Sequence, residues 1–304
     1  MLTRFSVIGV GLTVFILSLC VSTVQAEMPI EPYDYTQDFE STDPVSAWAS
    51  NGTYTENFKG LISKGAYSGT QVFELDVNFG TATYVYYKLP LTVPAEGNLR
   101  FSGRIRLADG TTPGCGAGLG ANVYYFPTTR SACGPFATYS LKPNVWQLVE
   151  EDVVAWGKEK GKVVMGLCWE VTGANVGVSM SHVGVFLFGS PGKRIVVDID
   201  DISLKGKVPS QADFQKEVKS RWAPAGAKID AKVVSWTASL LQAEARIDAF
   251  ADGDEKTKLR QQISVLKNTV SAIAKRGYIL TVEVSDVDKQ ISRLLTVSPA
   301  NAGS

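Results

Sequence analysis

The chain has 304 residues, and its 30 basic and 30 acidic side chains give a formal net charge of zero. This balance provides no electrostatic basis for binding nucleic acid or a strongly acidic surface. The length is sufficient for one large domain with an additional part.

Residues 1–26 have the three regions of an export signal. Arg4 gives a short basic start, an apolar run extends from Phe5 to Leu19, and Val24-Gln-Ala26 forms a small-residue cleavage site. The apolar run is close to the shortest length that spans a membrane, so a retained anchor is the alternative. We expect cleavage before Glu27 and a secreted, periplasmic or cell-surface protein with no stable membrane span.

Residues 27–206 contain short alternating segments that are separated by Gly, Pro and Asn. Many short strands without intervening helices are typical of a β-sandwich or jelly roll. We therefore predict an all-β jelly-roll or β-sandwich domain. Its expected strands are Gln71–Phe79, Thr83–Leu91, Leu99–Leu107, Gly118–Phe126, Trp146–Val153, Lys162–Val171, Val176–Phe188 and Arg194–Leu204.

Residues 207–304 change to a helical period, with apolar residues at spacings of three and four. We expect an α-helical hairpin of coiled-coil type that reverses at Gly253, after a short helix ended by Pro224 and Gly226. The second helix is expected to kink or end at Gly277, and Thr281–Val284 is compatible with helix or strand. The two seams are Ile229, Val233, Trp236, Leu240, Ala243, Ile247 and Phe250, then Leu259, Ile263, Leu266, Val270, Ile273, Gly277, Leu280, Val284, Val287, Ile291 and Leu294.

Lys207–Ser210 is the expected linker between the two parts, and Val297–Ser304 is expected to be frayed. A heptad seam closes its own hairpin in the simplest interpretation. The alternative is self-association or the docking of a partner helix.

Cys115, Cys133 and Cys168 remain after cleavage, and export permits disulfides. Cys115 and Cys133 flank a hairpin-like segment and are the expected pair. Cys168 lies in an apolar strand pattern and is expected to be a buried thiol. The odd number of cysteines leaves the pairing open.

Several sequence features occur in a defined order. Asp38-Phe39-Glu40 and Trp48 come before Gly65-Ala-Tyr-Ser-Gly69, and Asp200-Asp201 lie in the last predicted strand. In this order the chain resembles the galactose-binding-like jelly rolls that serve as carbohydrate-binding modules, over about residues 33–205.

The resemblance implies that the first and last strands pair and share a structural calcium ion. Glu40 and either Asp200 or Asp201 would then supply carboxylate oxygens, because side chains alternate across a strand. The alternative is an acid pair that is solvated at a sheet edge.

The resemblance also implies a polysaccharide or other glycan as the partner, bound on a sheet face or at the loops of one edge. Sugars are held by aromatic faces and by planar polar groups that bind hydroxyls. Strand alternation and the exposed position expected for a Trp in a Gly-rich loop give the candidate residues. They are Arg104, Arg106, Asn122, Tyr124, Trp156 and Glu170.

Two observations weigh against this interpretation of the face. Arginines on a sheet commonly pair with acids such as Glu170 and bind nothing. The aromatic residues Tyr84, Tyr86, Tyr87 and Trp146 are expected to pack between the sheets.

Catalytic patterns are weak in this sequence. The single histidine, His182, lies in an apolar strand pattern with no nucleophile motif beside it, and a structural or surface role is expected. The acid cluster Glu150-Glu151-Asp152 is interpreted as a solvated strand edge. We therefore predict no catalytic residues.

Together these features predict an exported, non-catalytic polysaccharide-binding protein with a structural calcium ion. One alternative is a cell-surface structural or adhesion protein that uses its helices for assembly. The other is a fragment of a larger glycoside hydrolase.

Overall fold

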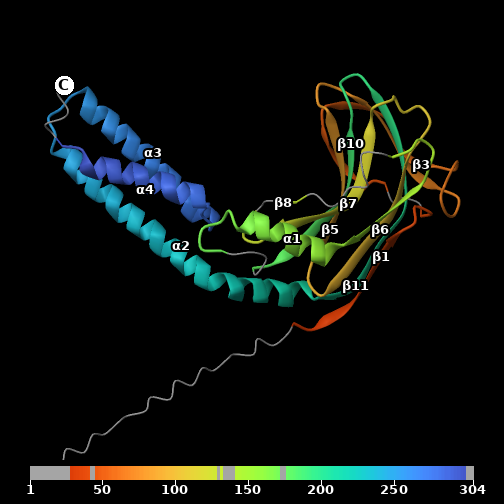
Figure 1. Cartoon of the computed structure of the whole chain (residues 1–304), viewed down its shortest axis with the longest axis horizontal. Helices are drawn as coiled ribbons and strands as arrows, with labels where there is room; N and C mark the ends of the chain where they lie inside the picture. The colour runs from red at the N-terminus through yellow and green to blue at the C-terminus, as the bar shows by residue number, and fades with distance from the viewer. Residues whose placement is uncertain (1–27, 42–44, 129–130, 133–140, 172–175, 299–304) are drawn as a thin grey trace, which may run out of the picture.

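The computed structural model describes residues 28–41, 45–128, 131–132, 141–171 and 176–298. These ranges form two antiparallel β-sheets that pack as a sandwich, followed by long helices that extend away from it (Figure 1). The fold class predicted from the sequence is therefore confirmed. The expected signal at residues 1–26 lies outside the described residues, within which no helix is long and apolar enough to cross a membrane.

The first sheet contains the two ends of the sandwich domain. Its order is β3-β4-β11-β6-β9, and β1 pairs with the distal half of β11, as the resemblance implies for first and last strands. Its elements are β1 (Ile30–Gln37), β3 (Tyr54–Ile62), β4 (Val72–Phe79), β6 (Asn98–Leu107), β9 (Gln147–Asp152) and β11 (Arg194–Pro209).

The second sheet has the order β2-β5-β10-β7-β8. Its elements are β2 (Ala49–Gly52), β5 (Tyr84–Pro94), β7 (Gly116–Tyr125), β8 (Ser131–Ala132) and β10 (Val178–Phe188). Alternation along β7 and β10 sends one set of side chains into the core and the other to the outer face. The large buried rings of Phe39, Trp48 and Phe73 pack together in that core.

A helix replaces one predicted strand. Residues Lys162–Val171 were expected to be β, but α1 spans Val153–Met165. The Asp152 side chain accepts the Ala155 N–H over 2.9 Å and caps this helix. Gly157 and Gly161, four residues apart, are both buried, and a Cβ on Gly157 would press on Val178. These glycines let the helix lie close to the sandwich, and their apolar neighbours mimic a strand pattern.

The expected linker is also different in the structure. Lys207 and Pro209 belong to β11, and Ser210 is the N-cap of α2 (Gln211–Asp248), where its hydroxyl accepts the Asp213 N–H. The chain thus passes from the central strand of the first sheet into a helix through a single residue.

The short preceding helix is not a separate element. α2 is a single helix of 38 residues that continues through Pro224 and curves along its length (Figure 1). Proline removes one backbone donor and crowds the preceding turn, which bends a helix without always ending it. Phe214 and Val218, at the start of α2, are buried in the core of the sandwich.

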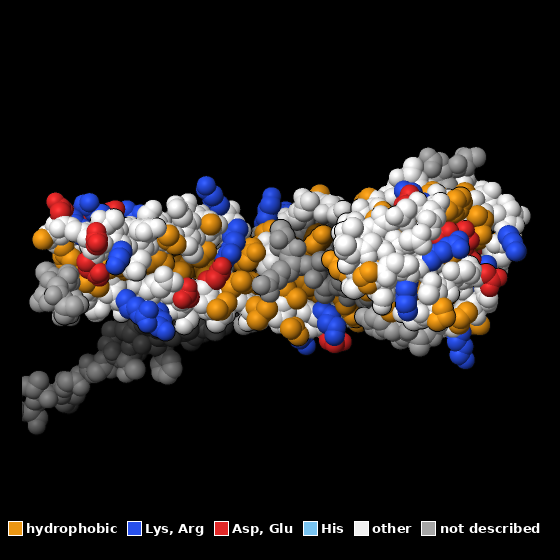
Figure 2. All heavy atoms as spheres, turned by 90° about the horizontal axis from the view of Figure 1, so that it is seen from above, with side chains coloured by type: hydrophobic (Ala, Val, Ile, Leu, Met, Phe, Trp, Pro, Cys, Tyr) orange, Lys and Arg blue, Asp and Glu red, His pale blue; other side chains and the backbone are white. Residues whose placement is uncertain are grey.

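The predicted seams form the core of the helical part. α3 (Asp254–Arg276) follows the turn at Gly253 and ends at Gly277, whose φ of 75° gives a left-handed C-cap. Thr281–Val284 begins α4 (Thr281–Thr296) and is helical, not a strand. Seam residues from all three helices, including Leu240, Leu266 and Ile291, are buried together. Figure 2 shows acidic and basic side chains distributed along the outside of these helices.

The cysteine pairing stays a prediction. Cys133 lies outside the described residues, and neither Cys115 nor Cys168 forms a disulfide with another described residue. Cys168 is buried, as expected, but it follows α1 and is not part of a long strand.

Candidate functional site

The structure divides the predicted sugar face between two opposite surfaces. Arg104 and Arg106 lie on β6 in the first sheet, whereas Asn122 and Tyr124 lie on β7 in the second sheet. All four side chains point outward, so the two pairs are on opposite sides of the sandwich. The structure therefore does not bring them into one site.

The other two candidates are near the helices. Trp156 is in α1, not in a loop, and is half-buried against the sandwich core. Glu170 accepts from Lys228 of α2 over 2.6 Å, so its ion pair joins the sandwich to the helical part. Neither residue lies on a sheet face.

The outer face of the first sheet is rich in charge, but its charges have partners. Arg106 donates to Asp198 over 2.7 Å and its guanidinium lies 4.7 Å from the Trp146 ring centroid. Arg104 covers the Tyr67 ring at 4.1 Å, and Tyr67 meets Trp146 edge to face. Trp146 therefore packs on the outer face, not between the sheets. Figure 2 shows a mixed acidic and basic group on the sandwich.

The double acid has a structural role in this arrangement. β11 changes neighbours from β4 to β1 at a bulge that contains Asp200 and Asp201, and Asp201 has a φ of 49°. One oxygen of buried Asp200 accepts the N–H groups of Tyr67 and Ser68 at 2.8 and 3.2 Å, and the other accepts the Asp201 N–H. Burial raises the pKa of Asp200, and these N–H donors oppose the rise.

Glu40 holds the other end of the loop between β3 and β4 that contains Tyr67 and Ser68. Its carboxylate accepts the hydroxyl and the N–H of Thr70 and the N–H of Gln71, and these donors lower its pKa. The described residues contain no group of three His, Cys, Asp or Glu side chains that could hold a metal ion. N–H and hydroxyl donors already contact the carboxylates of Glu40 and Asp200. The calcium ion at Glu40, Asp200 and Asp201 stays a prediction.

The outer face of the second sheet carries a group of aromatic side chains. Tyr84 and Tyr86 of β5 lie beside Phe186 and Phe188 of β10, and we call these four residues the aromatic face. The Tyr84 ring is stacked on Phe186 with centroids 5.8 Å apart, and Tyr84 is 49% exposed. An exposed ring supported by a second ring is a rigid platform for an apolar ligand surface.

Polar side chains continue this face along β10 and β7. His182 and Asn122 are direct cross-strand partners, and Asn122 Nδ2 lies 2.7 Å from His182 Nε2. Tyr86 Oη lies 3.2 Å from the same nitrogen, and Ser181 Oγ lies 2.8 Å from Nδ1. Burial, with a contribution from Lys88, lowers the pKa of His182 to about 4. A neutral ring with its proton on Nδ1 fits these partners.

Glycines make room for the rings on this face. Gly116 and Gly118 of β7 pair with Phe188 and Phe186, and Gly184 pairs with Gly120. A Cβ on Gly116 would collide with the Phe188 ring, and one on Gly184 would collide with the Tyr86 hydroxyl. On the outer face, aromatic rings therefore lie on β5 and β10, and the neighbouring strand β7 has no side chain at its glycines.

Sequence reasoning missed the aromatic face because it placed Tyr84 and Tyr86 inside the sandwich. Only Tyr87, which is fully buried, packs there. In Val185-Phe-Leu-Phe188 both faces of the strand are apolar, so the alternation of side chains does not indicate which face points to solvent. The signal available in the sequence was the run of alternate glycines at Gly116, Gly118 and Gly120, which marks the neighbouring strand.

No family model matches the chain, and no curated protein matches it either. Among solved structures, the chain is similar to the CBM22-1 xylan-binding domain from Paenibacillus barcinonensis Xyn10C, with 14% identity and a TM-score of 0.33 over 58% of this chain and 94% of that one. It is similar to the family 11 carbohydrate-binding module of the cellulase Lic26A-Cel5E of Clostridium thermocellum, with 11% identity and a TM-score of 0.34 over 59% of this chain and 95% of that one.

A β-1,2-glucanase from Parabacteroides distasonis is also similar, with 13% identity and a TM-score of 0.37, over 60% of this chain but 26% of that one. The sandwich thus resembles carbohydrate-binding modules in the solved structures.

Proposed function

We propose that this protein binds a polysaccharide on the outer face of its second sheet, without converting it. The observation that carries the proposal is the aromatic face, with Tyr84 exposed and supported by Phe186. The neighbouring His182 and Asn122 are buried, and His182 contacts the hydroxyl of Tyr86. Sugar rings present apolar CH surfaces to aromatic rings and hydroxyls to neutral donors and acceptors.

The first sheet supports this function less well. Two of its arginines are already paired with acids, Arg106 with Asp198 at 2.7 Å and Arg194 with Asp76 at 2.6 Å. A glycan there would have to displace ion pairs. The same pairing supports binding over catalysis, because these acids are held by cations and not arranged around an open site.

The polysaccharide-binding test is retention on insoluble polymers, with xylan, mixed-linked β-glucan, β-1,4-galactan and β-1,2-glucan as probes. Tyr84→Ala removes the exposed ring. Tyr67→Ala is its matched control in the loop that packs on the opposite sheet, because the two tyrosines are 49% and 46% exposed. A stacked ring contributes about 1 kcal/mol, so Tyr84→Ala is expected to weaken retention by roughly fivefold to tenfold.

The outcomes separate the candidate functions. If retention on the polymer is lost with Tyr67→Ala or Arg104→Ala but not with Tyr84→Ala, the binding site is on the first sheet. No retention on any polymer would favour the adhesion or assembly function instead. Release of reducing sugar from a polymer would favour an enzyme or a part of one.

Export belongs to the same proposal, because polysaccharides of this kind are met outside the cell. N-terminal sequencing of the mature protein is expected to begin at Glu27. Recovery of the full-length chain in membranes would contradict it.

A further inference from the structure

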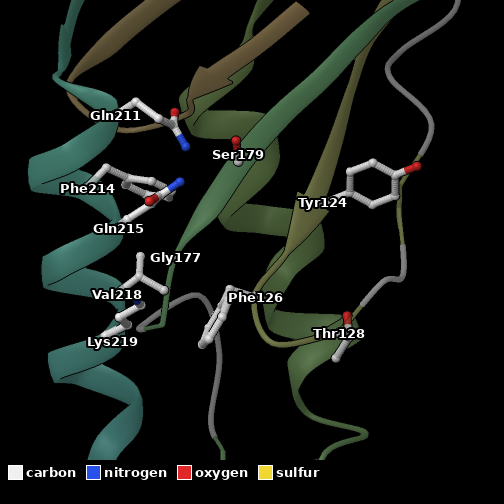
Figure 3. Close-up of a pocket in the computed structure, with 10 residues that line it drawn as sticks. All are labelled: Tyr124, Phe126, Thr128, Gly177, Ser179, Gln211, Phe214, Gln215, Val218 and Lys219. Atoms are coloured by element: carbon white, nitrogen blue, oxygen red, sulfur yellow. The ribbon is translucent and has the colours of Figure 1, made fainter. Parts of the chain in front are cut away.

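A cavity lies where the first turns of α2 pass the ends of β7 and β10. It has a volume of about 330 Å³ and is walled by Tyr124 and Phe126 of the sandwich and by Phe214 and Val218 of α2. Figure 3 shows the amides of Gln211 and Gln215 directed from α2 toward the strands, with Phe126 between helix and sheet.

The helix is held against the sheet at this point by close packing and by charge. A Cβ on Gly177 would collide with Val218, so the absence of a side chain there allows the approach. Arg221 donates to both carboxylate oxygens of Glu96, at 2.7 and 3.2 Å, and Trp222 meets Phe126 edge to face. The cavity is therefore a fixed feature of the joint between the two parts.

The cavity continues the outer face of the second sheet. Tyr124 is two residues from Asn122 on β7, so both side chains point outward, and Tyr124 pairs directly with Ser179 of β10. At about 3.3 Å per strand residue, the cavity begins about 7 Å from the His182–Asn122 pair. Phe186 of the aromatic face lies four residues beyond His182 on β10, so the cavity is about 20 Å from that ring. A chain of several sugar units bound across the aromatic face would therefore reach the cavity.

The lining suits a sugar unit. Aromatic rings offer surfaces for its CH groups, and a glutamine amide both donates to and accepts from hydroxyls. Among the described residues, neither Gln211 nor Gln215 uses its side-chain amide in a hydrogen bond to another residue. Both amides are thus available to a ligand.

We infer that α2 is part of the glycan site and that this cavity receives one further sugar unit of a chain bound on the second sheet. The inference rests on the proposed function and adds to it a contribution from the helical part. In this inference, the side-chain amides of Gln211 and Gln215 on α2 bind the hydroxyls of the further sugar unit.

Calorimetric titration with β-1,4-xylo-oligosaccharides and mixed-linked gluco-oligosaccharides, from disaccharide to hexasaccharide, tests this inference. The double variant Gln211→Ala/Gln215→Ala is expected to weaken binding of the longer oligosaccharides by roughly tenfold and to leave the shorter ones unchanged. Gln215→Trp, which fills the cavity mouth, is expected to do the same. Lys216→Ala is the matched control, because Lys216 is exposed on α2 outside the cavity.

The outcomes distinguish this inference from the proposed function. Oligosaccharide binding that depends on Tyr84 but is identical in the α2 variants at every length would overturn the inference alone. Absence of binding by the wild-type protein to every oligosaccharide and polymer would overturn both.

Discussion

The backbone N–H of Trp169 donates to the carbonyl oxygen of Ile279 over 2.7 Å, which joins the segment after α1 to the turn between α3 and α4. The N–H of Thr281 donates back to Leu167 over 2.8 Å, so this is a short antiparallel bridge. Together with the continuous β11–α2 connection, it fixes the helical part to the sandwich at two separate places. The two parts are therefore expected to unfold together.

Phe214→Ala tests this coupling. Phe214 is on α2 but is 5% exposed within the sandwich core, so the change removes a buried ring from both parts. The free energy of unfolding is expected to fall by about 3–5 kcal/mol. Lys216→Ala, on the same helix, should change it by less than about 0.5 kcal/mol.

Thermal unfolding followed by far-ultraviolet circular dichroism and by tryptophan fluorescence provides the measurement. Coincident transitions at a lower temperature are the expected result. Two separated transitions, with only the helical one moved, would show that the sandwich folds without α2.

The buried carboxyl group of Glu151 predicts a loss of stability as the pH rises toward 8. It is 7% exposed on β9, and burial raises its pKa to about 8, with a long hydrogen bond from the Ala121 N–H opposing the rise. Between about pH 4.5 and 8 the unfolded chain ionises this group while the folded protein keeps it protonated. Stability is therefore lost as the pH rises, by up to about 1.4 kcal/mol per unit.

Glu151→Gln keeps the shape and removes the proton equilibrium. The variant is expected to gain stability relative to wild type as the pH is raised from 5 to 8, in denaturant titrations at each pH. Parallel curves for the two proteins across this range would show that Glu151 is ionised in the folded state.

His182 predicts the opposite slope at acid pH. Its folded pKa of about 4 lies below the ordinary value of 6.5, so the unfolded chain takes up a proton first as the pH falls. Its contribution is complete above about pH 6.5 and is lost between there and about pH 4. Retention on polysaccharide is accordingly expected to be constant from pH 8 to 6. A step in retention near pH 6.5, absent in His182→Gln, would contradict a neutral buried ring.

Chelation and Asp200→Asn together test how the loop around Gly65 and Gly69 is held. Donors from Tyr67, Ser68 and Asp201 satisfy the carboxylate of Asp200, so removal of one acceptor should cost about 1–3 kcal/mol. EDTA separates two states of this loop: if the N–H donors alone hold it, the melting temperature stays unchanged. A fall in melting temperature with EDTA, restored by calcium, would support the metal implied by the sequence resemblance.

The sequence could predict those parts of the molecule whose two faces differ in polarity. In Leu99–Leu107, apolar residues alternate with arginines, and the structure places the two sets on opposite sides as expected. The heptad seams could also be predicted, because Leu240 and Leu266 recur at spacings of three and four from other apolar residues, and they are buried together. Periodicity carries this information within one element and needs no tertiary contact.

The candidate site could not be predicted in the same way, because it depends on how strands are ordered. Arg104 and Asn122 each point outward, but only the pairing of β6 with β11 and of β7 with β10 decides that they face away from each other. Likewise, the end of α1 was assigned to a strand at Lys162–Val171, because only the folded chain reveals that Gly157 and Gly161 serve a helix–sheet contact. The predicted helix end at Pro224 was wrong for a related reason, because packing of Trp222 and Ala225 against the sandwich keeps α2 continuous there.

The passage from β11 into α2 through Ser210 also sets how the molecule would bear mechanical load. β11 is hydrogen-bonded to β6 along one edge and to β4 and β1 along the other. A pull on the helices while the sandwich is held to a solid polymer would act along the axis of β11 and load both ladders in shear. Because ladder hydrogen bonds lie across the strand direction, many would have to yield at once. The β11–α2 connection is therefore expected to need a higher force to separate in shear than it would need if its hydrogen bonds broke one at a time.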